Sequence, residues 1–99
     1  MNIKIKSIHF DATEKLEAFI DKKISKLEKN AESATSAEVT LKVVKPETVK
    51  NKETQIRVVV PDGELFASKT CNTFEEGVDQ CIDAISKQWK KYKEKQQQK

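Results

Sequence analysis

The stretch that decides the fold spans residues 73–95 and reads T-F-E-E-G-V-D-Q-C-I-D-A-I-S-K-Q-W-K-K-Y-K-E-K. Its apolar residues recur at intervals of three and four, which predicts one buried stripe along a long amphipathic helix. The stripe consists of Phe74, Val78, Cys81, Ile82, Ile85, Trp89 and Tyr92. Because Trp89 lies on the same stripe as Ile82 and Ile85, we expect Trp89 to anchor the helix in the core.

The charges of this helix are sorted along its length. Residues 71–83 hold four acids and no base, whereas residues 84–99 hold six lysines and one acid. Acids near a helix N-terminus and cations near its C-terminus suit the helix dipole, but that effect fades within the first and last turns. The dipole therefore does not account for a basic block this long, which indicates either a partner or a solvated tail.

A second amphipathic helix is predicted nearer the N-terminus. Asp11, followed by Glu14, forms a capping-box pattern, and the helix should extend to about Lys29. Its apolar stripe consists of Leu16, Phe19, Ile20, Ile24 and Leu27. At about 100° per residue, Lys15, Lys22, Lys26 and Lys29 fall on one ridge, and Glu14, Asp21 and Glu28 fall on another. Such a lysine ridge fits a binding surface and a merely solvated face equally well.

Four other segments alternate apolar and polar residues, as half-buried strands do. They are residues 2–8, 37–44, 53–60 and 65–71. The inward face of the last segment is ambiguous, because Leu65, Ala67 and Cys71 compete with Phe66. In the first segment, the isoleucines at 3 and 5 point to one side and the lysines at 4 and 6 to the other.

The order of these elements predicts an α+β fold of two layers. The first crossover is long enough to make the first two strands parallel, and the short turn at 61–64 makes the last two antiparallel. The loop at 45–52 permits an antiparallel middle pair. Each helix has one apolar face, so both should pack on one face of a four-stranded mixed sheet. We expect a single domain over residues 1–95 and a frayed polar tail at 96–99.

Composition excludes several classes of protein. The net charge is only +3, so the total charge alone does not indicate a polyanion partner. The basic residues are nearly all lysines, and Arg57 is the one arginine. Two cysteines and one histidine give neither a disulfide framework nor a zinc site. No secretory signal, membrane span or catalytic motif is present, so we expect a cytoplasmic protein that is not an enzyme and has no cofactor.

Two stretches carry a resemblance to a known family. Residues 16–29 are similar to the pattern L-x-x-Y-x-x-x-K-[LI]-x-K-L, and residues 78–93 to A-I-D-x-A-x-D-K-L-x-x-Q-[LI]-x-K-Y-K. With these motifs the chain resembles the ribosome hibernation promoting factors, a family that includes the ribosome-associated inhibitor and the sigma-54 modulation proteins. The resemblance covers nearly the whole chain. It implies a β-α-β-β-β-α fold, which is like that of double-stranded-RNA-binding domains.

The resemblance also implies a function. Members bind the small ribosomal subunit in the channel used by mRNA and tRNA, and they block translation in stationary or starved cells. Basic residues on both helices would contact rRNA phosphates. Carried over by position, they are Lys22, Lys23, Lys26, Lys29, Lys87, Lys90, Lys91 and Lys93. Parallel helices would place both sets of lysines side by side as one basic surface. We expect a short form, monomeric when free, that acts with a separate ribosome-dimerising factor where ribosomes pair.

The chain departs from the family pattern at the last helix. An Asp before an aromatic residue is replaced by Asn72 and Thr73, a common Ala is Gly77, and Trp89 stands where Leu or Ile is usual. A usual Lys is Ala84, so one expected phosphate contact is missing. Two alternative functions fit the same basic surface: a module that binds an acidic protein, and a general binder of double-stranded RNA.

Overall fold

The chain folds in the predicted order of elements. The structure, a computed structural model, describes residues 2–8, 11–30, 35–44, 51–61 and 63–97, without the side chains of 28–30 and 93–97. The elements are β1 (Asn2–Ile8), α1 (Glu14–Asn30), β2 (Ser36–Val43), β3 (Lys52–Val60), β4 (Gly63–Cys71) and α2 (Phe74–Gln97). Because α2 extends to Gln97, the helix itself includes part of the expected tail, and fraying at 96–99 stays a prediction.

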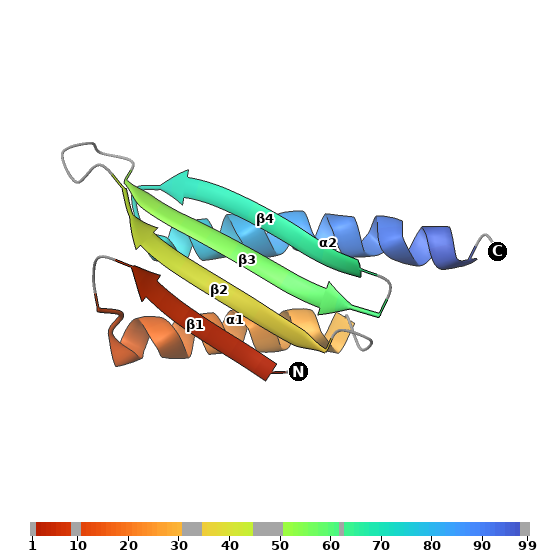
Figure 1. Ribbon diagram of the computed structural model, residues 1–99, viewed down its shortest axis with the longest axis horizontal. Coiled ribbons are helices and arrows are strands. Elements are labelled where there is room, and N and C mark those ends of the chain that lie inside the picture. Colours follow the sequence, from red (N-terminus) through yellow and green to blue (C-terminus); the bar gives the residue numbers. More distant parts are fainter. Residues whose placement is uncertain (1, 9–10, 31–34, 45–50, 62, 98–99) are drawn as a thin grey trace.

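The strands form one sheet in the order β1-β2-β3-β4. β1 is parallel to β2, and the other two pairs are antiparallel, as the connection lengths predict. Both helices lie on the same face of the sheet and run in the same direction (Figure 1). The predicted two-layer α+β fold is therefore confirmed, with the core between the helices and the sheet.

The core takes one face of each strand and one stripe of each helix. Its buried residues are Ile20, Ile24, Leu27, Ala37, Val39, Leu41, Ile56, Val58, Val60, Leu65, Ala67, Phe74, Val78, Cys81, Ile85 and Trp89. The ambiguity in β4 is settled by its pairing with β3, which aligns Leu65 and Ala67 with the inward residues Val58 and Ile56. Phe66 consequently lies on the opposite face of the sheet, where its side chain is 48% exposed.

Threonines cap both helices. The N–H of Leu16 donates to Oγ1 of Thr13 at 3.1 Å, and α1 begins at Glu14. The prediction that Asp11 is the N-cap is therefore wrong. In α2, the N–H of Glu76 donates to Oγ1 of Thr73 at 3.2 Å, which satisfies one of the donors that a helix start leaves unpaired.

Gly77 lets α2 approach β3 closely. A Cβ placed on Gly77 would lie 2.5 Å from Oγ1 and 3.0 Å from Cβ of Thr54, a contact too short to be tolerated. Thr54 is fully buried on the inward face of β3, so its side chain cannot turn into solvent. The glycine found where the family commonly has alanine thus has a physical reason in this chain: the Thr54 side chain fills the space that a methyl group would need.

Candidate nucleic-acid interface

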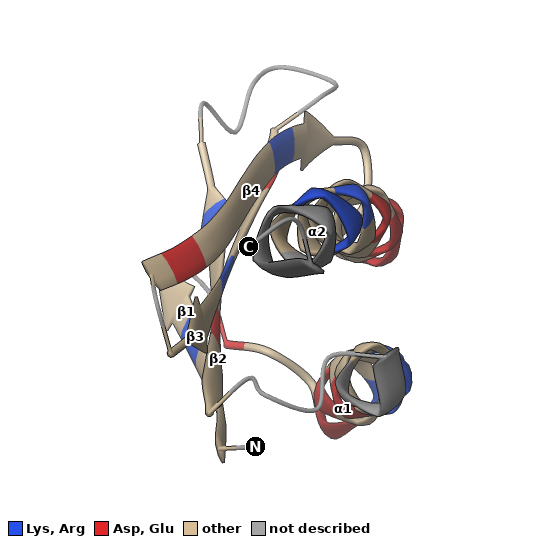
Figure 2. Cartoon of the chain, turned by 90° about the vertical axis from the view of Figure 1, so that its right-hand side faces the viewer, with Lys and Arg blue, Asp and Glu red and all other residues tan. Residues whose placement is uncertain are grey.

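The lysines of α1 lie apart from its acids. Lys22 and Lys26 are exposed and four residues apart, which places them on one side of the helix. Figure 2 shows basic and acidic residues on different sides of α1, with the acids on the side away from α2. The sorting predicted from the sequence is therefore present in the fold.

Lys23 has a different environment from its neighbours. Its Nζ lies 3.1 Å from Oδ1 of Asp79 on α2, and 5.5 Å from the centroid of the Phe19 ring. Lys23 is therefore part of the contact between the two helices. Among the predicted rRNA-binding lysines whose side chains the structure describes, it is the one whose charge is matched by an acid of the other helix.

The lysines of α2 lie in its C-terminal half, and the three whose side chains the structure describes are exposed. Lys90 and Lys91 are exposed, and so is Lys87, although its Nζ lies 3.4 Å from Oδ2 of Asp83. An exposed i,i+4 pair of this kind contributes little to stability, so a phosphate could replace the carboxylate at small cost. Lys29 and Lys93 belong to the same helices, but their side chains lie outside the described residues.

The two sets of lysines are offset along the helix direction. The Lys23–Asp79 contact places residue 23 of α1 level with residue 79 of α2. Because both helices rise about 1.5 Å per residue, Asn30 at the end of α1 is level with Ser86, and Lys90 lies about 6 Å further on. Figure 1 shows α2 extending past the end of α1. The expected side-by-side arrangement is therefore corrected: the acids of α2 flank the lysines of α1, and the lysines of α2 project beyond them.

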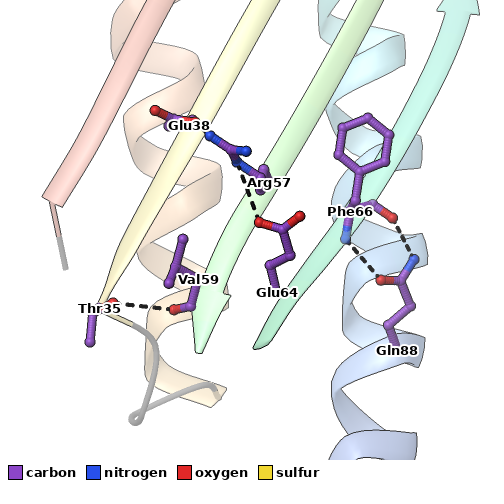
Figure 3. A network of polar contacts seen from close by, with 7 residues as sticks. All are labelled: Thr35, Glu38, Arg57, Val59, Glu64, Phe66 and Gln88. Carbon is purple, nitrogen blue, oxygen red and sulfur yellow. Dashed lines mark hydrogen bonds and ion pairs between the residues drawn. The ribbon is translucent and has the colours of Figure 1, made fainter. Parts of the chain in front are cut away.

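The opposite face of the sheet carries a mixture of charges. Arg57 on β3 contacts Glu38 on β2, and its Nε lies 3.7 Å from Oε2 of Glu64 on β4 (Figure 3). The hydrogen bond to Glu38 raises the pKa of the Arg57 guanidinium. Lys4 and Lys6 of β1 are exposed on this same face. The sole arginine is thus neutralised by two acids and lies on the side of the sheet away from the helices.

No cluster of three or more potential metal ligands occurs among the residues that the structure describes. Within those same residues, neither helix combines the length and apolarity needed to cross a bilayer.

A family signature described as sigma 54 modulation protein / S30EA ribosomal protein matches residues 3–97. The chain belongs to this family. One member with a known role is the ribosome hibernation promoting factor of Pseudomonas putida, which is 27% identical over 97 residues that cover 98% of this chain and 91% of the relative. The resemblance found in the two sequence motifs is thereby confirmed.

Two solved structures share the fold of this family member. A ribosomal subunit interface protein from Coxiella burnetii has a TM-score of 0.83 at 17% identity, covering 94% of this chain and 98% of that one. The N-terminal domain of Thermus thermophilus Protein Y has a TM-score of 0.78 at 20% identity, covering 93% and 99%. At these identities the likeness establishes the architecture, with two helices on one face of a four-stranded sheet.

Proposed function

We propose that this protein is a ribosome hibernation factor. It binds the small ribosomal subunit through rRNA contacts of its two lysine-bearing helices and blocks access of mRNA and tRNA, which inhibits translation in stationary or stressed cells. The observation that carries the proposal is the exposed group of Lys87, Lys90 and Lys91 at the projecting end of α2, in a chain of the S30EA family. This role is one of binding, in the cytoplasm, and it requires no catalytic group.

Lysine is suited to this role. It acts as a point charge on phosphate and lacks the planar fork with which arginine reads guanine edges. A surface of exposed lysines therefore recognises the backbone and the A-form shape of rRNA. The offset between the helices makes the surface long: Lys22 and Lys26 lie on α1, and the α2 lysines continue past its end. The eight predicted contacts remain proposals, and Lys23 would have to leave its contact with Asp79 to meet a phosphate.

The acidic first half of α2 fits the same proposal. Glu75, Glu76, Asp79 and Asp83 precede the lysines on that helix. Phosphates are repelled by these carboxylates and attracted by the lysines, so the acids restrict where along the helix pair an RNA strand can lie. We expect the rRNA to meet the C-terminal half of α2 and the outer side of α1. The free protein is proposed to be a monomer, and any pairing of ribosomes to require a separate factor.

Sedimentation of cell extract through a sucrose gradient separates this proposal from the alternatives. Co-migration with the small subunit supports the hibernation factor. A spread over all RNA-containing fractions would favour a general binder of double-stranded RNA. Absence from every RNA fraction would favour a module that binds an acidic protein, and it would overturn the proposal.

A further inference from the structure

Gln88 joins α2 to the free edge of the sheet. β4 is the last strand in the sheet order, so no other strand among the described residues pairs with its outer edge. The N–H of Phe66 donates to Oε1 of Gln88 at 3.0 Å, and Nε2 of Gln88 donates to the carbonyl oxygen of Phe66 at 2.7 Å (Figure 3). One carboxamide thus takes both backbone groups of one residue, as a residue of an adjacent strand would.

The position of this contact along α2 matters for the lysines. Gln88 directly follows Lys87 and comes two and three residues before Lys90 and Lys91. The next residue, Trp89, is buried against the core with 5% exposure. Beyond this point α2 projects past the end of β3 and the start of β4 (Figure 1). Gln88 and Trp89 therefore attach the helix to the sheet where its lysine-bearing part begins to project.

The two attachments do different things. Burial of Trp89 and of the rest of the apolar stripe keeps one side of α2 against the sheet, but this attraction is non-directional and leaves room for small rotations about the helix axis. The two hydrogen bonds of Gln88 require a defined distance and angle to a fixed strand, so they set both the rotation and the axial position of α2. Rotation of α2 decides in which direction its lysines point. Gln88 thus adds a directional link to the sheet at the point where the lysine-bearing part of α2 begins.

We propose that Gln88 is a positioning residue for the interface: by imitating a fifth strand at Phe66, it orients Lys87, Lys90 and Lys91 for a phosphate surface. The inference rests on the proposed function. It assigns Gln88 no contact with RNA. It accounts for a polar residue of α2 that neither the core nor the basic surface explains.

The test is the substitution Gln88→Met in the full chain, with Gln80→Met as the matched control. Methionine keeps the length of glutamine and removes both hydrogen bonds, and neither substitution changes the net charge. Gln80 lies on the same helix and is exposed. A second variant, Gln88→Ala, removes the amide while keeping a good helix former, so that the result does not depend on one side chain. The readouts are amide hydrogen exchange, melting temperature, and binding to purified small subunits at several salt concentrations.

In both Gln88 variants the Phe66 amide hydrogen should exchange about tenfold faster than in the parent. That factor corresponds to the loss of roughly the net free energy of one hydrogen bond. Their affinity for small subunits should fall roughly three- to tenfold, because the oriented state is then only a fraction of the population. The dependence of affinity on salt should also become shallower, since fewer lysines reach phosphates together. Gln80→Met should behave like the parent in all three readouts.

Two results would overturn the inference while leaving the proposed function intact. One is parent-like binding and salt dependence in variants whose Phe66 amide exchanges faster. The other is unchanged exchange of the Phe66 amide in both Gln88 variants, which would mean that the contact with Gln88 does not protect the strand edge. Failure of the parent protein itself to bind small subunits would instead refute the proposed function, and the positioning role with it.

Discussion

Replacing Gly77 with alanine is the sharpest test of how α2 packs. The added methyl group would lie 2.5 Å from Oγ1 of Thr54. The Thr54 side chain is fully buried, and its Oγ1 has no hydrogen-bond partner among the described residues. Thr54 cannot move outward, so either its side chain or the helix must shift. The substitution therefore adds volume to a site that is already full.

The magnitude follows from two opposing effects. Overpacking of a core costs about 1–3 kcal/mol, whereas alanine is favoured over glycine within a helix by about 1 kcal/mol. Gly77→Ala should therefore reduce the free energy of unfolding by up to about 2 kcal/mol. In a Thr54→Ala background the short contact to Oγ1 is gone, so the same change should become neutral or stabilising by up to about 1 kcal/mol. The coupling between the two positions is then about 1–3 kcal/mol.

Urea denaturation of the two single variants and the double variant measures that coupling. Fluorescence of Trp89, the single tryptophan, follows the transition. Thr54→Val serves as the control background, because it keeps a heavy atom where Oγ1 stands and should leave the cost of Gly77→Ala unchanged. If Gly77→Ala costs the same in the Thr54→Ala background as in the parent, the close approach described above is not what limits this position.

Three further predictions concern the core, the caps and one thiol. Trp89→Ala should cost about 3–5 kcal/mol of stability, and an unchanged melting temperature would contradict its burial. Thr13→Ala should cost about 1 kcal/mol and Asp11→Ala less than about 0.5 kcal/mol in urea denaturation; equal losses would contradict the assignment of Thr13 as the cap of α1. Burial raises the pKa of Cys81 from 9.0 to about 11, so the fold favours the neutral thiol. Its contribution to stability should be complete below pH 9 and fall as the pH rises towards 11, by at most about 3 kcal/mol, and Cys81→Ala should lose less stability over that range.

Most of the fold could be predicted because hydrophobic periodicity reports directly on burial. The stripes of both helices and the alternation of the strands correspond to the observed core, and connection lengths decide which strand pairs are parallel. The start of α1 could not be predicted in this way. Asp11 and Thr13 are both good N-caps, and the choice depends on how the chain enters the helix after β1. The inward face of β4 likewise required its register with β3.

The candidate interface was only partly predictable. Helical periodicity predicts that Lys22 and Lys26 lie on an exposed side of α1. It describes one helix at a time and says nothing about how two helices are placed relative to each other. The axial offset between α1 and α2 depends on how the two helices pack on the sheet. The hydrophobic periodicity of α1 or of α2 does not contain that information. For the same reason the contact of Lys23 with Asp79 and that of Gln88 with Phe66 join residues distant in the sequence and have no local signal.

Binding of purified small subunits over a range of salt concentrations tests the central claim most directly. The parent is compared with three double variants that each change the charge by the same amount: Lys22→Glu with Lys26→Glu, Lys90→Glu with Lys91→Glu, and Lys4→Glu with Lys6→Glu on the opposite face of the sheet. Each lysine that meets a phosphate releases counterions, so the parent's affinity should fall steeply with salt. Both helix doubles should bind more weakly and with a shallower dependence, while the β1 double should resemble the parent. If the helix doubles bind as the parent does with the same salt dependence, or if all three doubles lose affinity equally, then the lysines of α1 and α2 are not the interface.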